Sequence, residues 1–589
     1  MKSPEIRRLF GRLLHYTPGK HTAVVILAIV VGVMSGLANI AFRETLAFFK
    51  NVIFYRGHEL FGITEGFGLS RLYVVLLPVA GAVLLIPLSR MFPGEVNGYG
   101  FPAFLDRVNI RGGIVRLRSV FAKIIAPAIT IGSGGSAGVE GPIAQIGGGM
   151  GSLVGQLFRV SGNRMKLLIA AGAAGGIAAT FNAPIAGVMF ATEIVLLGNY
   201  ELMSFGAIVI SSGMATVVTR SYYGENPVFL VPAFHTTGIT EIPLYIVFGV
   251  IVGIIAVFYI KVFYAVQDRF SKMNISPYLK PVIGALIVGI IGIFFPQVFS
   301  DGYGVIEEVL KGQGALSLVF ILMLLKIFAT AVTLGSGGAG GVFAPSLFIG
   351  AMAGSTYGFI VHNLFPGLAA GPGEYATVGV GAFLAAATHA PLTGMFLLFE
   401  MTGNYLVIIP IMFASIVGTF TAKRIFKDSI DTVYFSRKGV DIHAGREGTL
   451  LSAIKVRDVM RRDFTTVRKD VNLTEFVDLM IEGGGFYFPV VDNEGEMVGI
   501  ISLQDVRKVL LEDYIKEIVT AGQLATEDVI VLNLDDNLKD AIEKFNIKDI
   551  DEIPVVDPEA PSRVLGILRR ADVMDVYNRE VLKKQVEEY

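Results

Sequence analysis

The chain has 589 residues, of which 53% are hydrophobic and 17% are charged, and its mean hydropathy is +0.62. A soluble protein of this length would need more charge to cover its surface, and a net charge of -1 gives no indication of a nucleic-acid partner. The lack of cysteine excludes disulfides, catalytic thiols and thiolate metal sites, and it fits soluble parts that lie in a reducing compartment.

The first 20 residues are basic and have no cleavage-like end, so they do not resemble a signal peptide. By the positive-inside rule, this segment predicts a cytoplasmic N-terminus. Apolar residues at helical spacing between Ile6 and Leu14 favour a helix that lies along the membrane surface, with a solvated basic tail as the alternative.

Long apolar runs follow, and several approach the ~20 residues that a helix needs to cross a hydrocarbon core. The clearest runs are Thr22–Ile40, Leu72–Leu88, Ile242–Phe258, Pro281–Phe295 and Leu316–Leu334. The chain's 69 glycines crowd into this apolar part, where close helix contacts and interrupted helices both need them. These features predict an all-α polytopic membrane protein.

Two separate blocks of the apolar part occur twice. The glycine-rich block 132–142 recurs at 335–345, and Asn182–Gly187 returns as His389–Gly394. Because both blocks recur at a nearly constant offset, chance similarity of glycine-rich sequence is a poor explanation. The membrane part is therefore an internal duplication.

The duplication divides residues 1–438 into halves at about 20–220 and 240–438. Transporters built from such repeats place their site near mid-membrane, where broken helices from both halves meet. Glycine and proline interrupt the apolar sequence at corresponding positions, which predicts a transport site there. In each half the second block then leads to an acid, Glu193 or Glu400.

Three glycine-rich segments end in a proline and are typical of helix starts: Gly98–Pro102, Gly138–Pro142 and Gly341–Pro345. The first N–H groups of a helix have no partner within it, so with the helix dipole they attract anions without any formal charge. Such a site releases an anion faster than Arg or Lys would. A set of hinges that only lets helices pack is the alternative, but three segments, two of them repeat-related, favour anion binding.

Glu140 is the unusual residue of these segments, because its repeat partner is Phe343. A carboxylate in an apolar membrane segment is costly and is therefore a candidate functional group. It could also be a carboxylate that merely stabilises a helix N-terminus. The same attraction predicts that Glu140 occupies an anion site, competes with the transported ion and is released by protonation.

The composition becomes charged towards the C-terminal end of the chain. We interpret 439–454 as a linker and 455–589 as a charged, soluble region. This region is also duplicated, because Phe488–Asp492 recurs as Ile553–Asp557, each followed by a second β-branched run. A helix such as Val506–Tyr514 then follows. The pattern predicts a compact α/β unit that is present twice.

The three helix starts resemble the signatures of the CLC family of chloride channels and chloride/proton exchangers, over roughly residues 20 to 438. The C-terminal pair resembles two CBS motifs, which many CLC proteins carry in the cytoplasm. The resemblance implies a homodimer with one inverted-repeat pore in each subunit. It implies that Glu140 is the gating glutamate. It also implies that the anion is held by backbone amides at Val342 and Phe343, with Tyr99 and Gly100 at the first helix start.

Three positions depart from the family pattern. Tyr99 replaces the usual serine of the first signature, Val139 replaces the basic residue before the glutamate, and Asp431 replaces the pore tyrosine. From its position, Tyr99 could supply the lost hydroxyl.

The proton path departs from the pattern as well, because proton-coupled members usually carry a second, inner glutamate. Here Ile194 takes that position and Glu193 precedes it, which is about 100° of rotation on a helix. This substitution weakens the prediction of exchange, whereas Glu140 supports it. Chloride/proton antiport is favoured, and a passive chloride channel is the alternative.

Ser502 and Asp505 match the Ser/Thr-x-x-Asp pattern of nucleotide-binding CBS domains, and the second copy keeps Asp572 but lacks the hydroxyl. An adenine nucleotide is therefore a candidate regulator, although no cofactor is required for transport. An ordinary helix N-cap would also account for Ser502 and Asp505.

No nucleophile–base constellation or phosphate loop occurs, and the histidines show no metal spacing, so we expect neither an enzyme nor an ATP-driven pump. A CBS-regulated cation transporter and a nucleotide sensor with a membrane anchor are the rival hypotheses. Helix starts favour anions over cations, and paired broken helices would serve no purpose in an anchor. The expected substrates are chloride and protons, and the expected location is a prokaryotic inner or plasma membrane.

Overall fold

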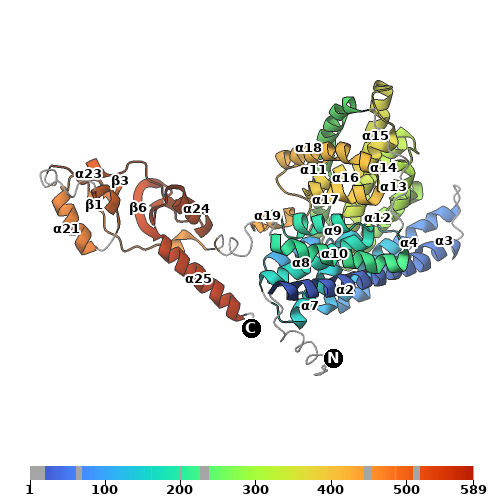
Figure 1. Cartoon of the computed structure of the whole chain (residues 1–589), viewed down its shortest axis with the longest axis horizontal. Coiled ribbons are helices and arrows are strands. Elements are labelled where there is room, and N and C mark those ends of the chain that lie inside the picture. The colour runs from blue at the N-terminus through green and yellow to red at the C-terminus, as the bar shows by residue number, and fades with distance from the viewer. Residues whose placement is uncertain are drawn as a thin grey trace. The chain divides into compact units, whose positions relative to one another are not determined.

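The computed structural model describes residues 20–60, 69–160, 162–198, 202–225, 238–442, 451, 454–483, 486–507 and 518–587. The chain divides into two compact units, Met1–Gly439 and Val440–Tyr589 (Figure 1). The helix predicted along the membrane surface lies outside the described residues, and so does most of the predicted linker.

The first unit is built from helices. They run in the order α2 (Lys20–Phe49), α3 (Arg56–Leu60), α4 (Leu76–Met91), α5 (Phe101–Asn109), α6 (Leu117–Gly132), α7 (Glu140–Leu157), α8 (Asn163–Phe181), α9 (Pro184–Phe190), α10 (Leu202–Tyr223), α11 (Ile242–Lys272), α12 (Lys280–Phe294), α13 (Tyr303–Leu310), α14 (Leu316–Gly335), α15 (Phe343–Leu364), α16 (Pro372–Thr388), α17 (Pro391–Thr402), α18 (Ile408–Ile425) and α19 (Val433–Ser436). Short 3-10 or π-helical segments adjoin several of them: η1 (Lys50–Tyr55), η2 (Leu69–Val75), η3 (Ala191–Val195), η4 (Ile239–Glu241), η5 (Pro296–Val298) and η6 (Tyr405–Val407).

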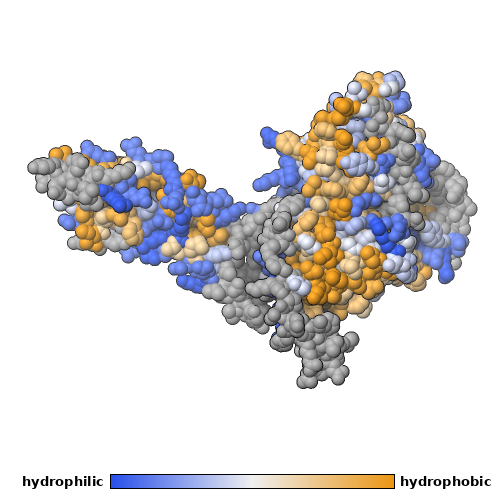
Figure 2. All heavy atoms as spheres, in the orientation of Figure 1, coloured by the Kyte–Doolittle hydropathy of each residue, from blue (hydrophilic) through white to orange (hydrophobic). Residues whose placement is uncertain are grey.

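Among the described residues, seven helices are long and apolar enough to cross a membrane. They are Thr22–Tyr55, Leu72–Met91, Asn163–Phe181, Ile239–Lys272, Leu316–Gly335, Phe343–Leu364 and Tyr405–Ile425. The apolar run expected at Pro281–Phe295 forms the shorter helix α12. Large apolar side chains such as Val247, Phe258 and Phe420 are half or more exposed, and Figure 2 shows apolar surface over much of this unit. A surface of this kind is stable in hydrocarbon and not in water.

The sequence duplication is also a structural duplication. Helices α6 to α10 of the first half correspond in order to α14 to α18 of the second. In both halves, glycines bring two helices into backbone contact. A Cβ added at Gly147 of α7 would lie 2.2 Å from the carbonyl oxygen of Gly172 of α8, and one at Gly350 of α15 would lie 2.2 Å from that of Gly379 of α16.

In the second repeated block, Asn182–Gly187 and His389–Gly394, one helix ends and the next one begins. Helices α8 and α16 both end on a residue in the left-handed region, Asn182 with φ 55° and His389 with φ 59°. The Ala-Pro that follows each of them begins the next helix, α9 or α17, with proline in its first turn.

The second unit contains two three-stranded sheets, one for each sequence copy. The strands are β1 (Val467–Arg468), β2 (Tyr487–Val491) and β3 (Met497–Ser502) in one sheet, and β4 (Leu532–Asn533), β5 (Glu552–Asp557) and β6 (Ala560–Arg569) in the other. In each sheet the first strand pairs in parallel with the second, and the second pairs antiparallel with the third. The equal topology confirms that the α/β unit is present twice.

The helices of this unit pack on the sheets. They are η8 (Val456–Asp458), α21 (Leu473–Gly483), α22 (Leu503–Arg507), α23 (Ala521–Leu524), α24 (Leu538–Lys548) and α25 (Arg570–Glu587). Each copy has its own apolar core, centred on Phe476 and Phe488 in the first and on Phe545 and Leu568 in the second. The helix predicted at Val506–Tyr514 is described only up to residue 507.

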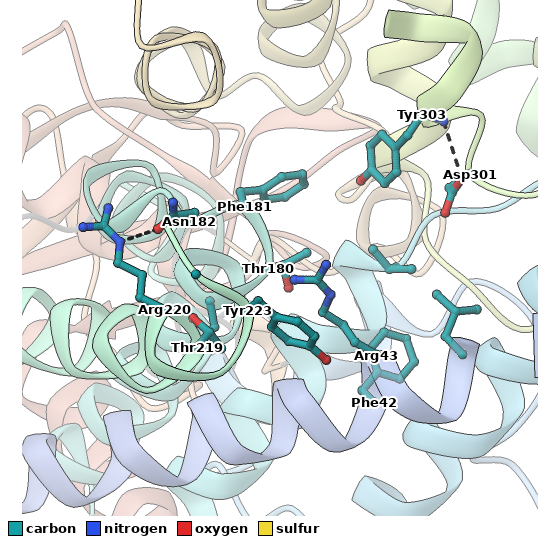
Figure 3. Close-up of a pocket in the computed structure, with 14 residues that line it drawn as sticks. Phe42, Arg43, Thr180, Phe181, Asn182, Thr219, Arg220, Tyr223, Asp301 and Tyr303 are labelled. Atoms are coloured by element: carbon teal, nitrogen blue, oxygen red, sulfur yellow. Dashed lines mark hydrogen bonds between the residues drawn. The ribbon is translucent and has the colours of Figure 1, made fainter. Parts of the chain in front are cut away.

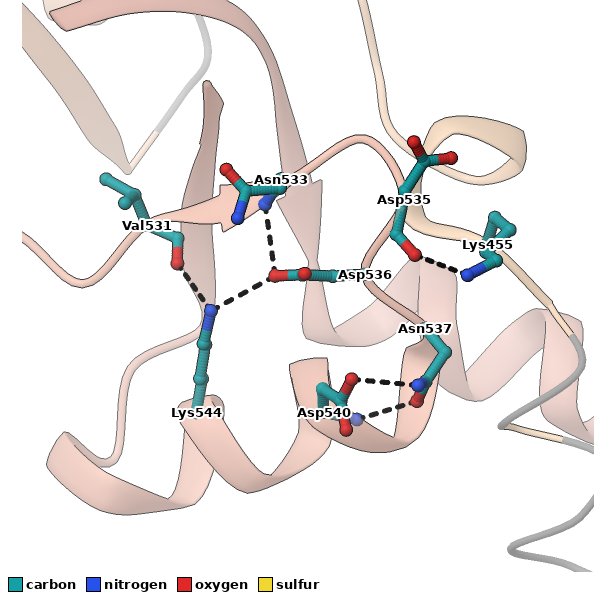
Figure 4. A network of polar contacts seen from close by, with 8 residues as sticks. All are labelled: Lys455, Val531, Asn533, Asp535, Asp536, Asn537, Asp540 and Lys544. Carbon is teal, nitrogen blue, oxygen red and sulfur yellow. Dashed lines mark hydrogen bonds and ion pairs between the residues drawn. The ribbon is translucent and has the colours of Figure 1, made fainter. Parts of the chain in front are cut away.

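A network of polar contacts orders the start of α24 (Figure 4). The Lys544 ammonium donates to the carbonyl oxygen of Val531 at 2.8 Å and to the Asp536 carboxylate at 3.1 Å. The side chain of Asn537 accepts the N–H of Asp540 at 3.0 Å and so caps the helix. These contacts tie the loop after β4 to the helix that follows it.

Candidate functional site

The three predicted helix starts are helix starts in the structure. Helix α5 begins at Phe101, α7 at Glu140 and α15 at Phe343, and all three residues are buried. A proline follows within the first three residues of each helix. The first N–H groups of these helices have no carbonyl partner within the helix, so they are available as donors.

Gly138 and Gly341, at corresponding positions of the two repeats, join the loops before α7 and α15. The N–H of each glycine donates to the carbonyl oxygen of the other at 2.8 Å. A Cβ added at Gly341 would lie 2.8 Å from the backbone nitrogen of Gly141, so the contact has no room for a side chain. The starts of α7 and α15, one from each half, are therefore fixed side by side.

The side chain of Glu140 is fully buried, and its carboxylate lies at the start of α15. One oxygen accepts the N–H of Ala344 at 3.0 Å, and the other accepts the hydroxyl of Tyr303. A Cβ added at Gly138 would lie 2.3 Å from the carboxylate, so only glycine lets the side chain take this position. The Glu140 carboxylate thus engages a backbone N–H in the first turn of α15.

The turn before Tyr303 is held by a buried lysine. Lys326 of α14 is fully buried, and its ammonium donates to the carbonyl oxygens of Val298 and Ser300 at 3.0 and 2.9 Å. The same ammonium lies 4.9 Å from the ring centre of Phe348. Neither Tyr303 nor Lys326 was among the predicted site residues, although a lysine in an apolar run is a signal that could have identified the second.

A cavity of about 420 Å³ reaches Tyr303, and its lining includes two basic side chains and one acidic side chain, Asp301 (Figure 3). Arg43 of α2 and Arg220 of α10 line it. The Arg43 guanidinium lies 4.2 Å from the ring centre of Tyr223, and Arg220 donates to the side chain of Asn182 at 2.6 Å. The tyrosine that contacts the buried carboxylate of Glu140 therefore borders a space whose lining has more basic than acidic side chains.

Tyr99 and Asp431, two of the departures from the family pattern, contact each other. The Tyr99 hydroxyl donates to the carboxylate of Asp431, 332 residues away in the sequence. Asp431 is buried, and the ring of Tyr99 lies edge-on to Phe263 at 5.8 Å between ring centres. The hydroxyl of Tyr99 is thus engaged by a carboxylate.

Gly100 lies directly against a basic side chain. A Cβ added at Gly100 would lie 2.4 Å from the ammonium nitrogen of Lys123 on α6. Lys123, Tyr99 and Gln145 border a second cavity of about 140 Å³. The predicted anion-binding residues Tyr99 and Gly100 therefore have a cation beside them that was not among the predicted residues.

Val342 and Phe343, the other predicted anion-binding residues, are buried at the start of α15. The ring of Phe343 packs against that of Phe190, with 5.5 Å between their centres. Because these residues adjoin Ala344, their amides belong to the same helix start that the carboxylate of Glu140 occupies.

The two candidates for the inner proton path differ in their surroundings. Ile194 is buried and apolar. The carboxylate of Glu193 accepts the N–H of Leu392 at 3.0 Å, the N–H of Thr393 at 2.7 Å and the hydroxyl of Thr393 at 2.8 Å. Glu193 therefore caps the start of α17.

The predicted nucleotide-binding residues take part in two separate contacts. Asp505 accepts the N–H and the hydroxyl of Ser502 at 2.8 and 2.7 Å, which caps the start of α22. In the first turn of α25, Asp572 accepts two hydrogen bonds from Arg461 at 2.7 and 2.8 Å. The hydrogen bonds from Arg461 hold the pKa of Asp572 below its ordinary value.

Two known families match the two units. The voltage gated chloride channel family matches residues 80–423, and the CBS domain matches residues 456–512 and 521–579. The first match covers the repeated helix starts, and the second covers both three-stranded sheets.

Individual relatives cover most of their own length. A putative chloride channel protein, ClcB-like, of Ralstonia nicotianae is 33% identical over 400 residues, which are 67% of this chain and 92% of that protein. An H(+)/Cl(-) exchange transporter, ClcA, of Vibrio campbellii is 31% identical over 415 residues, which are 68% of this chain and 86% of that protein.

Solved structures are similar as well. A slow cyanobacterial Cl-/H+ antiporter gives a TM-score of 0.65 at 26% identity, over 72% of this chain and 99% of that one. A eukaryotic CLC transporter has the same fold, with a TM-score of 0.62 at 20% identity, over 93% of this chain and 97% of that one. Since the family match covers more than half of the sequence, the chain belongs to the voltage gated chloride channel (CLC) family and carries a pair of CBS domains.

Proposed function

We propose that this integral membrane protein exchanges chloride for protons, with Glu140 as the group that binds the proton and competes with the anion. The observation that carries the proposal is the hydrogen bond from the Ala344 N–H to the Glu140 carboxylate at 3.0 Å. Amides at a helix start attract anions in general, so a carboxylate there stands where chloride would bind.

The coupling of chloride movement to proton movement follows from the competition between the Glu140 carboxylate and chloride. Ionised Glu140 and chloride cannot both hold the amides of Val342, Phe343 and Ala344. When Glu140 takes up a proton, its charge and most of its attraction to the helix start are lost, so the side chain leaves and chloride enters. When the proton departs, the carboxylate returns and displaces the anion. Each replacement of the Glu140 carboxylate by chloride at the start of α15, or the reverse, therefore involves one proton.

Helix α2 indicates which side of the membrane the cavity of Arg43 and Arg220 faces. Its 30 residues extend over about 45 Å, and Arg43 lies near the end away from residue 20. With the cytoplasmic N-terminus that the basic segment predicts, the cavity of Arg43 and Arg220 faces the outside. The two arginines would then concentrate anions at the entrance that leads to Tyr303 and Glu140.

The relatives support exchange and also provide the alternative. The exchange transporter of Vibrio campbellii and the cyanobacterial antiporter favour chloride/proton antiport. The ClcB-like protein carries the name of a channel. Passive chloride conduction is the second candidate, and the observation that favours it is the apolar Ile194 at the position of the inner proton group.

Flux in liposomes tests the proposal. The purified chain is reconstituted, the membrane potential is clamped with a potassium ionophore, and chloride and proton movements are recorded together. We expect an outward chloride gradient to drive uphill proton uptake. Chloride movement without uphill proton movement would establish a channel. No chloride movement above that of empty liposomes, with the protein folded, would exclude both functions.

We further propose that the CBS pair binds an adenine nucleotide and biases transport. The support is the spacing of Ser502 and Asp505 together with the acid Asp572 in the second copy. A ligand shifts transport only by its difference in affinity between two states, so an effect of about 1–3 kcal/mol is expected. Calorimetry with ATP, ADP and AMP tests binding, with Asp505→Ala as the control. Equal binding by that variant would show that Ser502 and Asp505 are not the site.

A further inference from the structure

Asp431 lies in the short segment between α18 and α19 and is only 1% exposed. One carboxylate oxygen accepts the hydroxyl of Tyr99. Among the residues that the structure describes, its other oxygen, Oδ2, has no hydrogen-bond partner. A buried acceptor without a partner destabilises the fold, and it does so more strongly when it is charged. A purely structural hydrogen bond to Tyr99 would be met equally well by an amide, without a carboxylate.

The groups around Asp431 are aromatic and do little to stabilise a negative charge on its carboxylate. Tyr259 and Tyr264 of α11 lie within electrostatic reach of its carboxylate. The hydroxyl of Tyr264 donates to the carbonyl oxygen of Ile430 at 2.8 Å. These phenols carry no positive charge, so an ionised Asp431 is costly in this place.

The charged groups on the neighbouring elements form no ion pair with Asp431 in the described part of the chain. Arg437, at the end of α19, pairs with Asp268 of α11 at 2.7 Å. Lys123 of α6 lies against Gly100. Asp428, three residues before Asp431, accepts the hydroxyl of Ser436 at 2.6 Å. Within the described part of the chain, no basic side chain forms an ion pair with Asp431.

The pair adjoins the candidate anion site. Tyr99 directly precedes Gly100 and the start of α5. Its ring also faces the first turn of α7, because a Cβ added at Gly141 would lie 3.9 Å from the ring edge of Tyr99. Tyr99 therefore lies between two of the three helix starts and the carboxylate of Asp431.

We propose that Asp431 and Tyr99 form a second, proton-operated anion gate, in addition to Glu140. The proposal rests on the chloride transport proposed above. While ionised, Asp431 repels an approaching anion and engages the Tyr99 hydroxyl. When Asp431 takes up one proton, its charge is removed and its own O–H becomes a donor. The hydroxyl of Tyr99 is then free to turn, and two hydroxyl donors face the anion.

The test removes the first gate and examines what remains. Full-length Glu140→Gln protein in liposomes should still release chloride faster as the pH falls from neutral to weakly acidic. One controlling proton changes a rate by at most about tenfold per pH unit. In the double variant with Asp431→Asn, the rate should be high and independent of pH, because an amide can donate without a proton. Asp428→Asn on the Glu140→Gln background is the matched control and should keep the pH dependence.

The outcomes are distinct from those of the proposed function. No chloride release by the unmodified protein would overturn transport itself. A Glu140→Gln protein whose rate is already independent of pH, or a double variant that keeps the dependence, would overturn the second gate. If Asp431→Asn does not fold, Asp431→Ser takes its place. Calorimetric chloride binding in detergent gives a second readout, since on the Glu140→Gln background the affinity should rise at acidic pH only in variants that retain Asp431.

Discussion

Glu193 and Glu400, at corresponding positions of the two repeats, cap each other's helices. Glu193 accepts three hydrogen bonds from the first turn of α17. Glu400, near the end of α17, accepts the N–H groups of Ile185 and Ala186 at 3.0 and 2.7 Å at the start of α9, which leads to Glu193. Because both halves show this geometry, helix capping alone accounts for the position of Glu193.

Because each glutamate caps a helix of the other repeat, substitutions at the two positions should reduce stability by similar amounts. Glu193→Gln and Glu400→Gln should each destabilise the membrane unit by about 0.5–2 kcal/mol, the usual effect of losing a helix cap. Thermal unfolding of the purified chain in detergent measures the loss. We expect uphill proton transport to survive in both variants. Its disappearance in the Glu193 variant alone would assign that residue to the proton path.

Glu140→Gln should make chloride flux faster and should abolish uphill proton movement, because the neutral amide mimics the protonated acid. The pH dependence of the flux that remains in this variant should be the part that Asp431 controls. Flux assays with simultaneous proton recording measure both effects. Glu241→Gln is a matched control, since Glu241 is also buried and accepts a backbone N–H, that of Ala370 at 2.8 Å, and a tyrosine hydroxyl, that of Tyr245 at 3.2 Å. It should leave proton coupling intact. A variant at Glu140 that still couples protons would contradict the proposed gate.

Tyr303→Phe removes one of the two donors that hold the Glu140 carboxylate. A hydrogen bond to a charged group is worth about 1.5–3 kcal/mol, so release of the carboxylate becomes easier and chloride flux should rise by about tenfold or more. Initial rates in liposomes measure this change. Tyr245→Phe, which removes the equivalent hydroxyl at Glu241, should leave the rate unchanged. A slower Tyr303→Phe protein would show that the hydroxyl assists opening.

The Arg461–Asp572 pair predicts a pH-dependent stability of the CBS unit. The pKa of Asp572 is lowered from 3.8, chiefly by the hydrogen bonds from Arg461. A lowered pKa in the folded state stabilises the fold above the ordinary value, and the contribution is lost as the pH falls through the folded-state value. Arg461→Ala should therefore lower the unfolding temperature at neutral pH.

The difference in unfolding temperature between Arg461→Ala and the unmodified protein should vanish in strong acid, where Asp572 is protonated in both proteins. Differential scanning calorimetry over a pH series measures it. Arg468→Ala is the control, because its ion pair with Asp470 is largely exposed and should contribute little. A constant difference across the pH series would show that Arg461 acts through packing and not through its charge.

Much of the fold could be predicted because local signals and repetition agree. Gly98–Pro102, Gly138–Pro142 and Gly341–Pro345 each combine glycine with proline, and each precedes or begins a helix, as expected. The recurrence of the blocks indicated that two helix starts would come together. In the structure the hydrogen bonds between Gly138 and Gly341 join these two helix starts.

The partners of the charged residues could not be predicted in this way. Tyr303 is 163 residues from Glu140 and belongs to no repeated block, and only the packing of α13 brings the two together. Tyr99 and Asp431 were each identified as departures from a pattern, but their contact depends on tertiary structure. A local pattern specifies where a helix begins, whereas the group that reaches its first amides comes from elsewhere in the chain.

The glycine contacts between α7 and α8, and between α15 and α16, have a mechanical consequence. With carbonyl oxygens only 2.2 Å from where a Cβ would be, neither helix of a pair can slide past the other without collision. Each pair is therefore rigid within its own half, and the two hydrogen bonds between Gly138 and Gly341 join the halves at their helix starts. We therefore expect the cycle to proceed without rocking of one half against the other. Motion is left to single side chains, so the speed of transport should depend on rotamer changes and proton arrival more than on the viscosity or thickness of the surrounding bilayer.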